Sequence, residues 1–132
     1  MRFSNKDEAS NLVIECLKQT LSEYRRTHPQ ITRSGKWGLD DAYNLQKYDP
    51  NGAYFKSHCE NDSKNNPRML AWMVYLNTVT DGGGTYFEGY DTTLEAVEGR
   101  MVIWPAYWTH HHNGIVSPTE TKYIATGWFS FK

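Results

Sequence analysis

Two short stretches of the sequence carry side chains that can bind a metal ion, and the first is WTHHHNGIV at residues 108–116. It contains three consecutive histidines, His110, His111 and His112. In a β-strand successive side chains point to opposite faces, so His110 and His112 would share one face and His111 would lie on the other. One strand therefore supplies at most two imidazoles to one ion, and the remaining ligands must come from another segment.

The second stretch, YFKSHCEND, offers the missing ligands. His58 and Glu60 are two residues apart, so in an extended segment they lie on one face while Cys59 points away. With one histidine from the first stretch they would form a set of two histidines and one carboxylate, which leaves coordination positions open and is typical of non-haem Fe(II) oxygenases. Each stretch alone is equally typical of ordinary side chains, because His-x-Glu pairs are common in strands and histidine clusters in loops are usually solvated.

A helix near the N-terminus is the first element expected to support such a site. Asn5, with Glu8 three positions later, favours a helix start, and Pro29 favours its end. The helix is predicted over residues 7–26 and is followed by a polar loop to about residue 42. Its apolar stripe, at helical spacings of three and four, consists of Ile14, Leu17, Leu21 and Tyr24.

From Tyr43 onward the chain is predicted to form short strands. The turn sequences DPNG, NDSKNNP, DGGG, EG and SPTE separate runs rich in β-branched and aromatic residues. Seven or eight strands behind one helix favour a compact all-β barrel or sandwich, in a single domain of residues 1–132. The sequence shows neither strand–helix alternation nor a phosphate-loop glycine motif. The expected strands are 43–48, 53–60, 69–77, 92–97, 100–104, 109–116 and 121–131.

Composition excludes several classes of partner. The chain has 14 Lys and Arg against 15 Asp and Glu, a net charge of -1, which argues against nucleic acid because phosphate binding needs surplus positive charge. Cys16 and Cys59 have no paired spacing, which favours a reduced protein, although one disulfide between them stays open. The N-terminus lacks the apolar core of a signal peptide, and no apolar run approaches the ~20 residues of a membrane span. We therefore expect a soluble, cytoplasmic protein with no membrane partner.

Six motifs follow one another over residues 43–131: KYDPNGAYFKSHCE, WMVYLN, GGGTYF, EGRMVIWP, HNGIVSPTETK and KYIATGW. In this order they resemble the Fe(II)- and 2-oxoglutarate-dependent dioxygenases of the prolyl 4-hydroxylase-like family. The resemblance implies a double-stranded β-helix (a cupin-like jelly roll) over residues 43–131, with a helical buttress over residues 5–28 packed outside it. Greek-key connections in such a fold would bring residues 58–60 and 112 together.

The resemblance implies an Fe(II) site at His58, Glu60 and His112. The carboxylate departs from the family pattern, because Glu60 stands where most members carry aspartate. The longer side chain must coordinate from a slightly retracted backbone. Asp62, on the same face, is an alternative carboxylate, and loss of iron binding is a third outcome of the departure.

The histidine run leaves two candidates for the distal ligand. His112 lies ten residues before Lys122, the spacing that the family favours, and its HNG sequence resembles the usual His-x-Gly. His110 lies twelve residues before Lys122 and five after Pro105, as the distal histidine does in some members. We favour His112, in which case His110 is expected to line the site and His111 to be structural or solvated.

The family's cosubstrate, 2-oxoglutarate, needs a cation at its far carboxylate, and Lys122 is the matching residue. In the strand KYIATGW, the side chains of Lys122, Thr126 and Trp128 share one face. They would offer the pocket a cation, a hydroxyl and an aromatic lining. The resemblance further implies that Tyr75 bonds the far carboxylate and that Tyr48 lies near the keto-acid end. A salt-bridged strand lysine and ordinary interior tyrosines are the alternative interpretations.

The implied reaction is hydroxylation of a C–H bond, coupled to oxidative decarboxylation of 2-oxoglutarate to succinate and CO2. It uses Fe(II), 2-oxoglutarate and O2, with ascorbate as an accessory reductant. The substrate would be a peptide, peptidyl proline being the family's best-known target, or a small molecule. Two other classes of function are open: a cupin-like zinc or nickel domain that does not use 2-oxoglutarate, and a non-enzymatic barrel whose histidines are surface residues.

Overall fold

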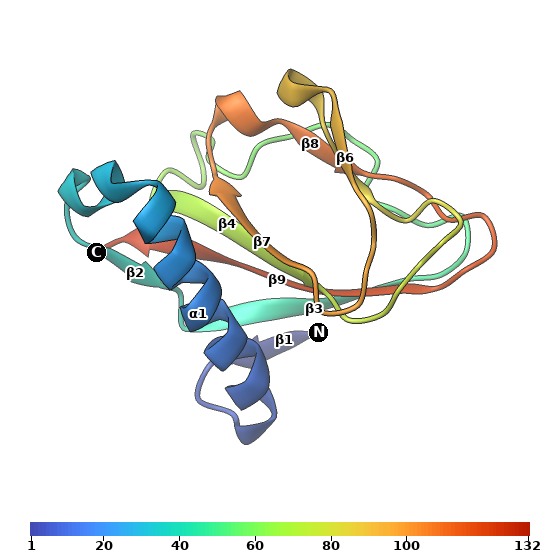
Figure 1. Cartoon of the computed structure of the whole chain (residues 1–132), viewed down its shortest axis with the longest axis horizontal. Helices are drawn as coiled ribbons and strands as arrows, with labels where there is room; N and C mark the ends of the chain where they lie inside the picture. The colour runs from blue at the N-terminus through green and yellow to red at the C-terminus, as the bar shows by residue number, and fades with distance from the viewer.

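The chain folds into two antiparallel β-sheets with one long helix on the outside, and the computed structural model describes residues 1–132 (Figure 1). An all-β core with an N-terminal helix is thereby confirmed. The larger sheet contains, in spatial order, β1 (Arg2–Ser4), β3 (Ala42–Tyr48), β9 (Lys122–Phe131), β4 (Arg68–Tyr75) and β7 (Met101–Pro105), with β2 (Trp37–Leu39) also paired to β9. The smaller sheet contains β6 (Thr92–Leu94), β5 (Thr85–Phe87) and β8 (His112–Gly114), in that order.

The helix α1 (Asn11–Thr27) packs its apolar stripe against the outer face of the larger sheet (Figure 1). Leu17 at the centre of the stripe is only 1% exposed, as expected for the residue that faces the sheet most directly. The helix begins four residues later than predicted, because a short 3-10 helix, Glu8–Ser10, precedes it. The predicted cap at Asn5 is wrong: its side chain instead donates to the carbonyl oxygen of Asp40 over 2.6 Å.

The central strand β4 is buried on both faces, which explains its nearly continuous apolar sequence. One set of alternate side chains packs into the core beneath α1, and the other set faces the space between the two sheets. Because β4 is held between β7 and β9, its inner face is fixed in place, and Ala71 and Met73 on that face line the space between the sheets. The first set is Leu70, Trp72 and Val74; the second is Ala71, Met73 and Tyr75.

The strand predicted over residues 53–60 is not formed. This segment runs beside residues 106–114 but makes only one isolated bridge, between His58 and His112. The facing residues Trp108–His110 form a 3-10 helix, and a helical turn cannot extend a ladder of backbone hydrogen bonds. For the same reason the strand predicted over 109–116 begins only at His112, as β8, and it ends at Gly114.

Other strand boundaries differ mainly where the strands are short. The predicted strands 43–48, 69–77, 100–104 and 121–131 occur, within two residues at each end, as β3, β4, β7 and β9. The strand predicted at 92–97 ends at residue 94, and the predicted loop and turn segments contain β2 and β5. Strands of three residues are too short to show a period, so only their pairing with distant strands defines them.

Cys16 is exposed and Cys59 partly buried, and both are free thiols, so the disulfide that the sequence left open is not formed. None of the helices is long and apolar enough to cross a membrane.

Candidate active site

A cavity of about 500 Å³ lies between the two sheets. Its wall comes from β3, β4, β7 and β9 of the larger sheet, from β5 and β8 of the smaller one, and from the irregular segment that follows β3. The sequence-predicted site residues that line it are His58, Glu60, His112, Lys122, Tyr48, Thr126 and Trp128.

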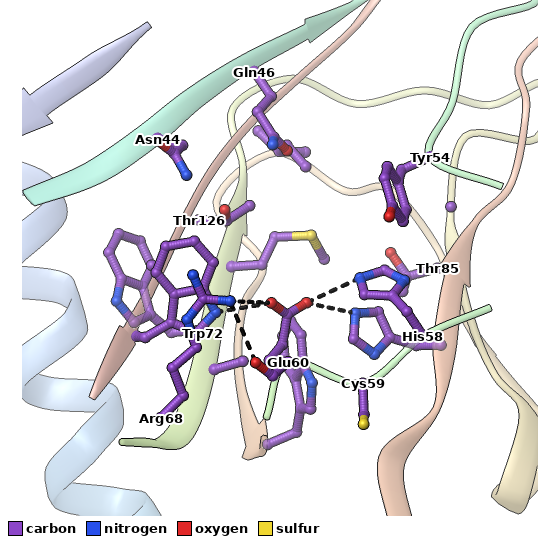
Figure 2. A pocket seen from close by; sticks show the side chains of 18 of the residues that line it. Asn44, Gln46, Tyr54, His58, Cys59, Glu60, Arg68, Trp72, Thr85 and Thr126 are labelled. Carbon is purple, nitrogen blue, oxygen red and sulfur yellow. Dashed lines mark hydrogen bonds and ion pairs between the residues drawn. The ribbon is translucent and has the colours of Figure 1, made fainter. Parts of the chain in front are cut away.

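Two imidazoles and one carboxylate converge at one end of this cavity. The Nε2 atoms of His58 and His112 lie 3.0 and 3.2 Å from the same oxygen of Glu60, Oε1. The potential ligand atoms of the three residues all lie within 4.8 Å of one another. Figure 2 shows the Glu60 carboxylate between the His58 imidazole and the Arg68 guanidinium, with the Cys59 sulfur pointing away.

Backbone hydrogen bonds place these side chains, although only His112 belongs to a strand. The backbone nitrogens of His58 and His112 each donate to the other residue's carbonyl oxygen. Two residues further on, the nitrogens of Glu60 and Asn61 both donate to the carbonyl of Ala106. The segment therefore crosses the open edge of the smaller sheet at a fixed register, which aims both His58 and Glu60 at His112.

The Nδ1 contacts of the two imidazoles are those expected of metal-binding histidines. The Nδ1 atom of His58 lies 2.9 Å from the Lys56 carbonyl oxygen, and that of His112 lies 2.9 Å from the His110 carbonyl oxygen. A carbonyl only accepts, so each Nδ1 carries a hydrogen and donates it. Each Nε2 then points at the Glu60 carboxylate: a protonated imidazole donates to that carboxylate, and a neutral one leaves the Nε2 lone pair for a metal ion. Backbone acceptors commonly orient metal-binding histidines in this way, and a bound cation would take the place of the Nε2 protons between the three groups.

The charges at the cluster favour the ligating form of the carboxylate. Burial would raise the pKa of Glu60, but hydrogen bonds from His112, His58 and Trp128 outweigh it and hold that pKa far below its usual range. Burial would also lower the pKa of His58, yet its bonds to Glu60 and to the Lys56 carbonyl raise the pKa overall. The carboxylate is therefore ionised and attracts positive charge to the cluster.

The second oxygen of Glu60 has its own partners. The Trp128 indole nitrogen donates to Oε2 over 2.9 Å, and the Arg68 Nη1 lies 3.6 Å from the same oxygen. The Arg68 guanidinium also stacks on the Trp128 ring, 3.6 Å from its centroid. Trp128, expected only to line the pocket, thus donates a hydrogen bond directly to the Glu60 carboxylate. No motif in the sequence surrounds Arg68, so the sequence alone does not indicate its role.

Lys122 is a buried cation at another part of the cavity wall. It is only 4% exposed, and its Nζ donates to the Gly83 carbonyl over 2.9 Å and lies 5.3 Å from the Tyr48 ring centroid. Gly83 has φ of 75°, a left-handed conformation that favours glycine. No carboxylate forms an ion pair with Lys122, and burial lowers its pKa. A buried ammonium without an acidic partner is suited to an anionic ligand.

Tyr75 lies behind the cavity wall. It is fully buried, and its hydroxyl is 2.6 Å from the Thr85 hydroxyl oxygen. Thr85 lines the cavity, whereas Tyr75 does not. Thr85 belongs to the GGGTYF motif, but the motif alone does not indicate that its side chain lines the cavity. The tyrosine predicted to touch the cosubstrate thus reaches the cavity only through this threonine.

The alternative ligands lie elsewhere. Asp62 closes a turn, where its Oδ1 accepts from the backbone nitrogens of Lys64 and Asn65, and it is not part of the metal-binding cluster. The expectation that His110 lines the site is wrong. It belongs to a 3-10 helix, so strand alternation does not apply to it, and it lines a separate apolar pocket beside Tyr90.

The family and the fold are shown by comparison with known proteins. The model of the 2OG-Fe(II) oxygenase superfamily matches residues 43–130. A search of curated protein sequences finds no match. Among solved structures, a viral collagen prolyl hydroxylase from Paramecium Bursaria Chlorella virus-1 is 18% identical, with a TM-score of 0.72 over 99% of this chain and 79% of that one. A Pseudomonas putida prolyl-4-hydroxylase is 19% identical, with a TM-score of 0.73 over 100% of this chain and 71% of that one.

A Phytophthora capsici prolyl 4-hydroxylase has a TM-score of 0.71 and 21% identity, over 98% of this chain and 47% of that one. At these identities the likeness concerns the fold, and it confirms the predicted jelly roll. The sequence match spans the segment that carries the two histidines, the carboxylate and the buried lysine. The chain belongs to the 2OG-Fe(II) oxygenase superfamily.

Proposed function

We propose that His58, Glu60 and His112 hold the Fe(II) of this oxygenase, that Lys122 anchors its 2-oxoglutarate, and that the substrate is a peptide, with peptidyl proline as the first candidate. One observation carries the assignment of the site. The only three-residue cluster able to hold a metal and a buried, unpaired lysine line the same cavity. A cupin-like domain without 2-oxoglutarate would give that lysine no role.

The roles of the side chains follow from their chemistry. When bound, Fe(II) supplies the oxidation, in which O2 and 2-oxoglutarate give succinate, CO2 and a hydroxylated C–H bond. The two imidazoles and Oε1 of Glu60 would hold the metal, and a set of two histidines and one carboxylate leaves positions open for other ligands. The Lys122 ammonium orients the far carboxylate of 2-oxoglutarate, and Ile124 and Trp104 limit water in the same cavity.

The character of the cavity wall supports a peptide substrate. Asn44, Gln46 and Asn65 line the cavity, and each amide side chain can donate to and accept from peptide groups. Three of the similar structures are named as prolyl hydroxylases, one of them a collagen prolyl hydroxylase. Peptidyl proline is therefore the first substrate to test.

Two measurements test this function. Addition of 2-oxoglutarate to the anaerobic Fe(II)-loaded protein is expected to produce a weak metal-to-ligand charge-transfer band, which the His112→Ala variant lacks. Succinate release is then screened with proline-containing peptides and with free amino acids. Absence of the band in the parent protein would rule out the oxygenase assignment. Succinate release with amino acids but not with peptides would rule out the peptide substrate alone.

A further inference from the structure

We infer that Trp128 and Arg68 are positioning residues that hold Glu60 by one oxygen, so that a glutamate performs the task of the shorter aspartate usual in this family. This inference rests on the proposed function for the identity of the metal, and on the geometry of Glu60 for everything else. Neither residue touches the reacting atoms in this assignment.

The two oxygens of Glu60 have different environments. Oε1 faces only the Nε2 atoms of His58 and His112. Oε2 points the other way, into the Trp128 indole nitrogen at 2.9 Å and toward Arg68 at 3.6 Å. An indole N–H and a guanidinium are donors only, so neither can take the place of a metal ligand. They occupy Oε2 and leave Oε1 as the single atom that the carboxylate offers to the cluster.

The holding groups are themselves rigidly placed. Trp128 belongs to β9, the strand that is paired on both sides, and its ring is covered by the Arg68 guanidinium. Arg68 begins β4, and its Nη1 also donates to the Glu60 carbonyl oxygen over 3.3 Å. A glutamate has one more rotatable bond than an aspartate, and these contacts remove that freedom before a metal arrives.

Holding Oε2 limits the number of Glu60 oxygens that can bind the metal to one. A set of two histidines and one carboxylate is useful because it leaves positions open for a chelating cosubstrate and for O2. A freely rotating glutamate could bind through both oxygens and close one of those positions. Holding Oε2 away from the cluster prevents that second contact.

A double-substitution cycle tests the inference by Mn(II) affinity alone, measured from the electron paramagnetic resonance signal of free Mn(II) without 2-oxoglutarate or O2. Loss of an outer partner of a metal ligand typically costs 10–100-fold in affinity, so Trp128→Phe is expected to weaken Mn(II) binding by about tenfold or more. In the parent protein, Glu60→Asp is expected to lower the Mn(II) affinity about tenfold. In the Trp128→Phe protein, Glu60→Asp is expected to lower the Mn(II) affinity less than about threefold. The indole nitrogen, which only the longer glutamate side chain reaches, is then absent.

Trp108→Phe is the matched control, because it removes an indole that is 77% exposed and outside the cavity, and it is expected to leave Mn(II) affinity unchanged. Thermal unfolding reports whether each variant folds. If Trp128→Phe does not fold, the same cycle with Arg68→Met decides. The inference would be overturned if the losses of Mn(II) binding free energy from the two substitutions simply add in the double variant. It would also be overturned if Trp128→Phe binds Mn(II) within threefold of the parent. Failure of the proposed function would appear separately, as no charge-transfer band with 2-oxoglutarate.

Discussion

His58 and His112 are joined by a reciprocal pair of backbone hydrogen bonds. The nitrogen of His58 donates to the carbonyl of His112 over 3.1 Å, and the nitrogen of His112 donates back over 2.9 Å. Their ring centroids are 4.4 Å apart, although the residues are more than fifty positions apart in the sequence. This backbone bridge holds the two residues side by side. Removing one ring should therefore delete a ligand and leave the bridge intact.

His112→Ala is expected to abolish measurable Mn(II) and Fe(II) binding, because the variant keeps the backbone bridge but loses one of three ligand atoms. His111→Ala is the matched control, since His111 is outside the metal-binding cluster, and it should bind the metal like the parent. His110→Ala is expected to do the same, because His110 lies in the separate apolar pocket. Isothermal titration under anaerobic conditions measures all three. Metal binding that survives in His112→Ala but not in His110→Ala would contradict the ligand assignment.

Lys122→Met is expected to weaken 2-oxoglutarate binding while leaving metal binding unchanged. Methionine keeps much of the stem's packing but removes the ammonium, so the far carboxylate is left without its partner. Such a loss typically costs about 2–5 kcal/mol. Since about 1.4 kcal/mol is a factor of ten, the affinity should fall by roughly thirty-fold or more. Titration of 2-oxoglutarate into the Mn(II)-loaded protein measures this, with Lys47→Met, an exposed lysine on β3, as the control. An affinity within threefold of the parent would exclude Lys122 as the anchor.

The affinity for 2-oxoglutarate is expected to fall as the pH rises. Burial lowers the pKa of Lys122 below its usual value of 10.5. Only the protonated ammonium pairs with a carboxylate, so binding raises this pKa in the complex. The affinity is therefore full below the pKa of the free protein and declines as the pH rises through it. Dissociation constants measured under anaerobic conditions between about pH 7 and 10 test this, because 2-oxoglutarate itself is fully ionised there. The Lys122→Met variant should lack the decline, and a parent protein whose affinity is independent of pH would count against the pairing.

Gly127→Ala is expected to destabilise the fold. A Cβ at this position would lie 2.7 Å from three atoms of the Trp72 indole, which belongs to the core beneath α1. Such overpacking typically costs about 1–3 kcal/mol. Gly38→Ala is the control, because its Cβ would meet only the Cε atom of Lys132, at 3.7 Å. Urea unfolding measures both. Equal unfolding free energies for Gly127→Ala and the parent would show that the indole can move.

The sequence predicted the long elements well because their signals are local. The stripe of α1 and the apolar runs of β4 and β9 are long enough to show a period, and all three elements are present. The strand predicted over residues 53–60 is wrong, because local composition does not reveal that the facing segment contains a 3-10 helix. Because His110 is part of this 3-10 helix, it does not share the face of His112 that strand alternation predicts for it. Local patterns thus identified the residue types of the site but not all of their directions.

By itself, the sequence determined the family, the jelly-roll class and the identity of the residues that can bind a metal, because these depend on residue types in a fixed order. Only the tertiary structure decided which of them meet. It placed His112 rather than His110 beside His58, buried Lys122 without an acidic partner, and set Tyr75 behind Thr85. It also turned the second oxygen of Glu60 toward Trp128, sixty-eight residues away in the chain. Contacts of this kind are set by long-range strand pairing and packing, which no local pattern encodes.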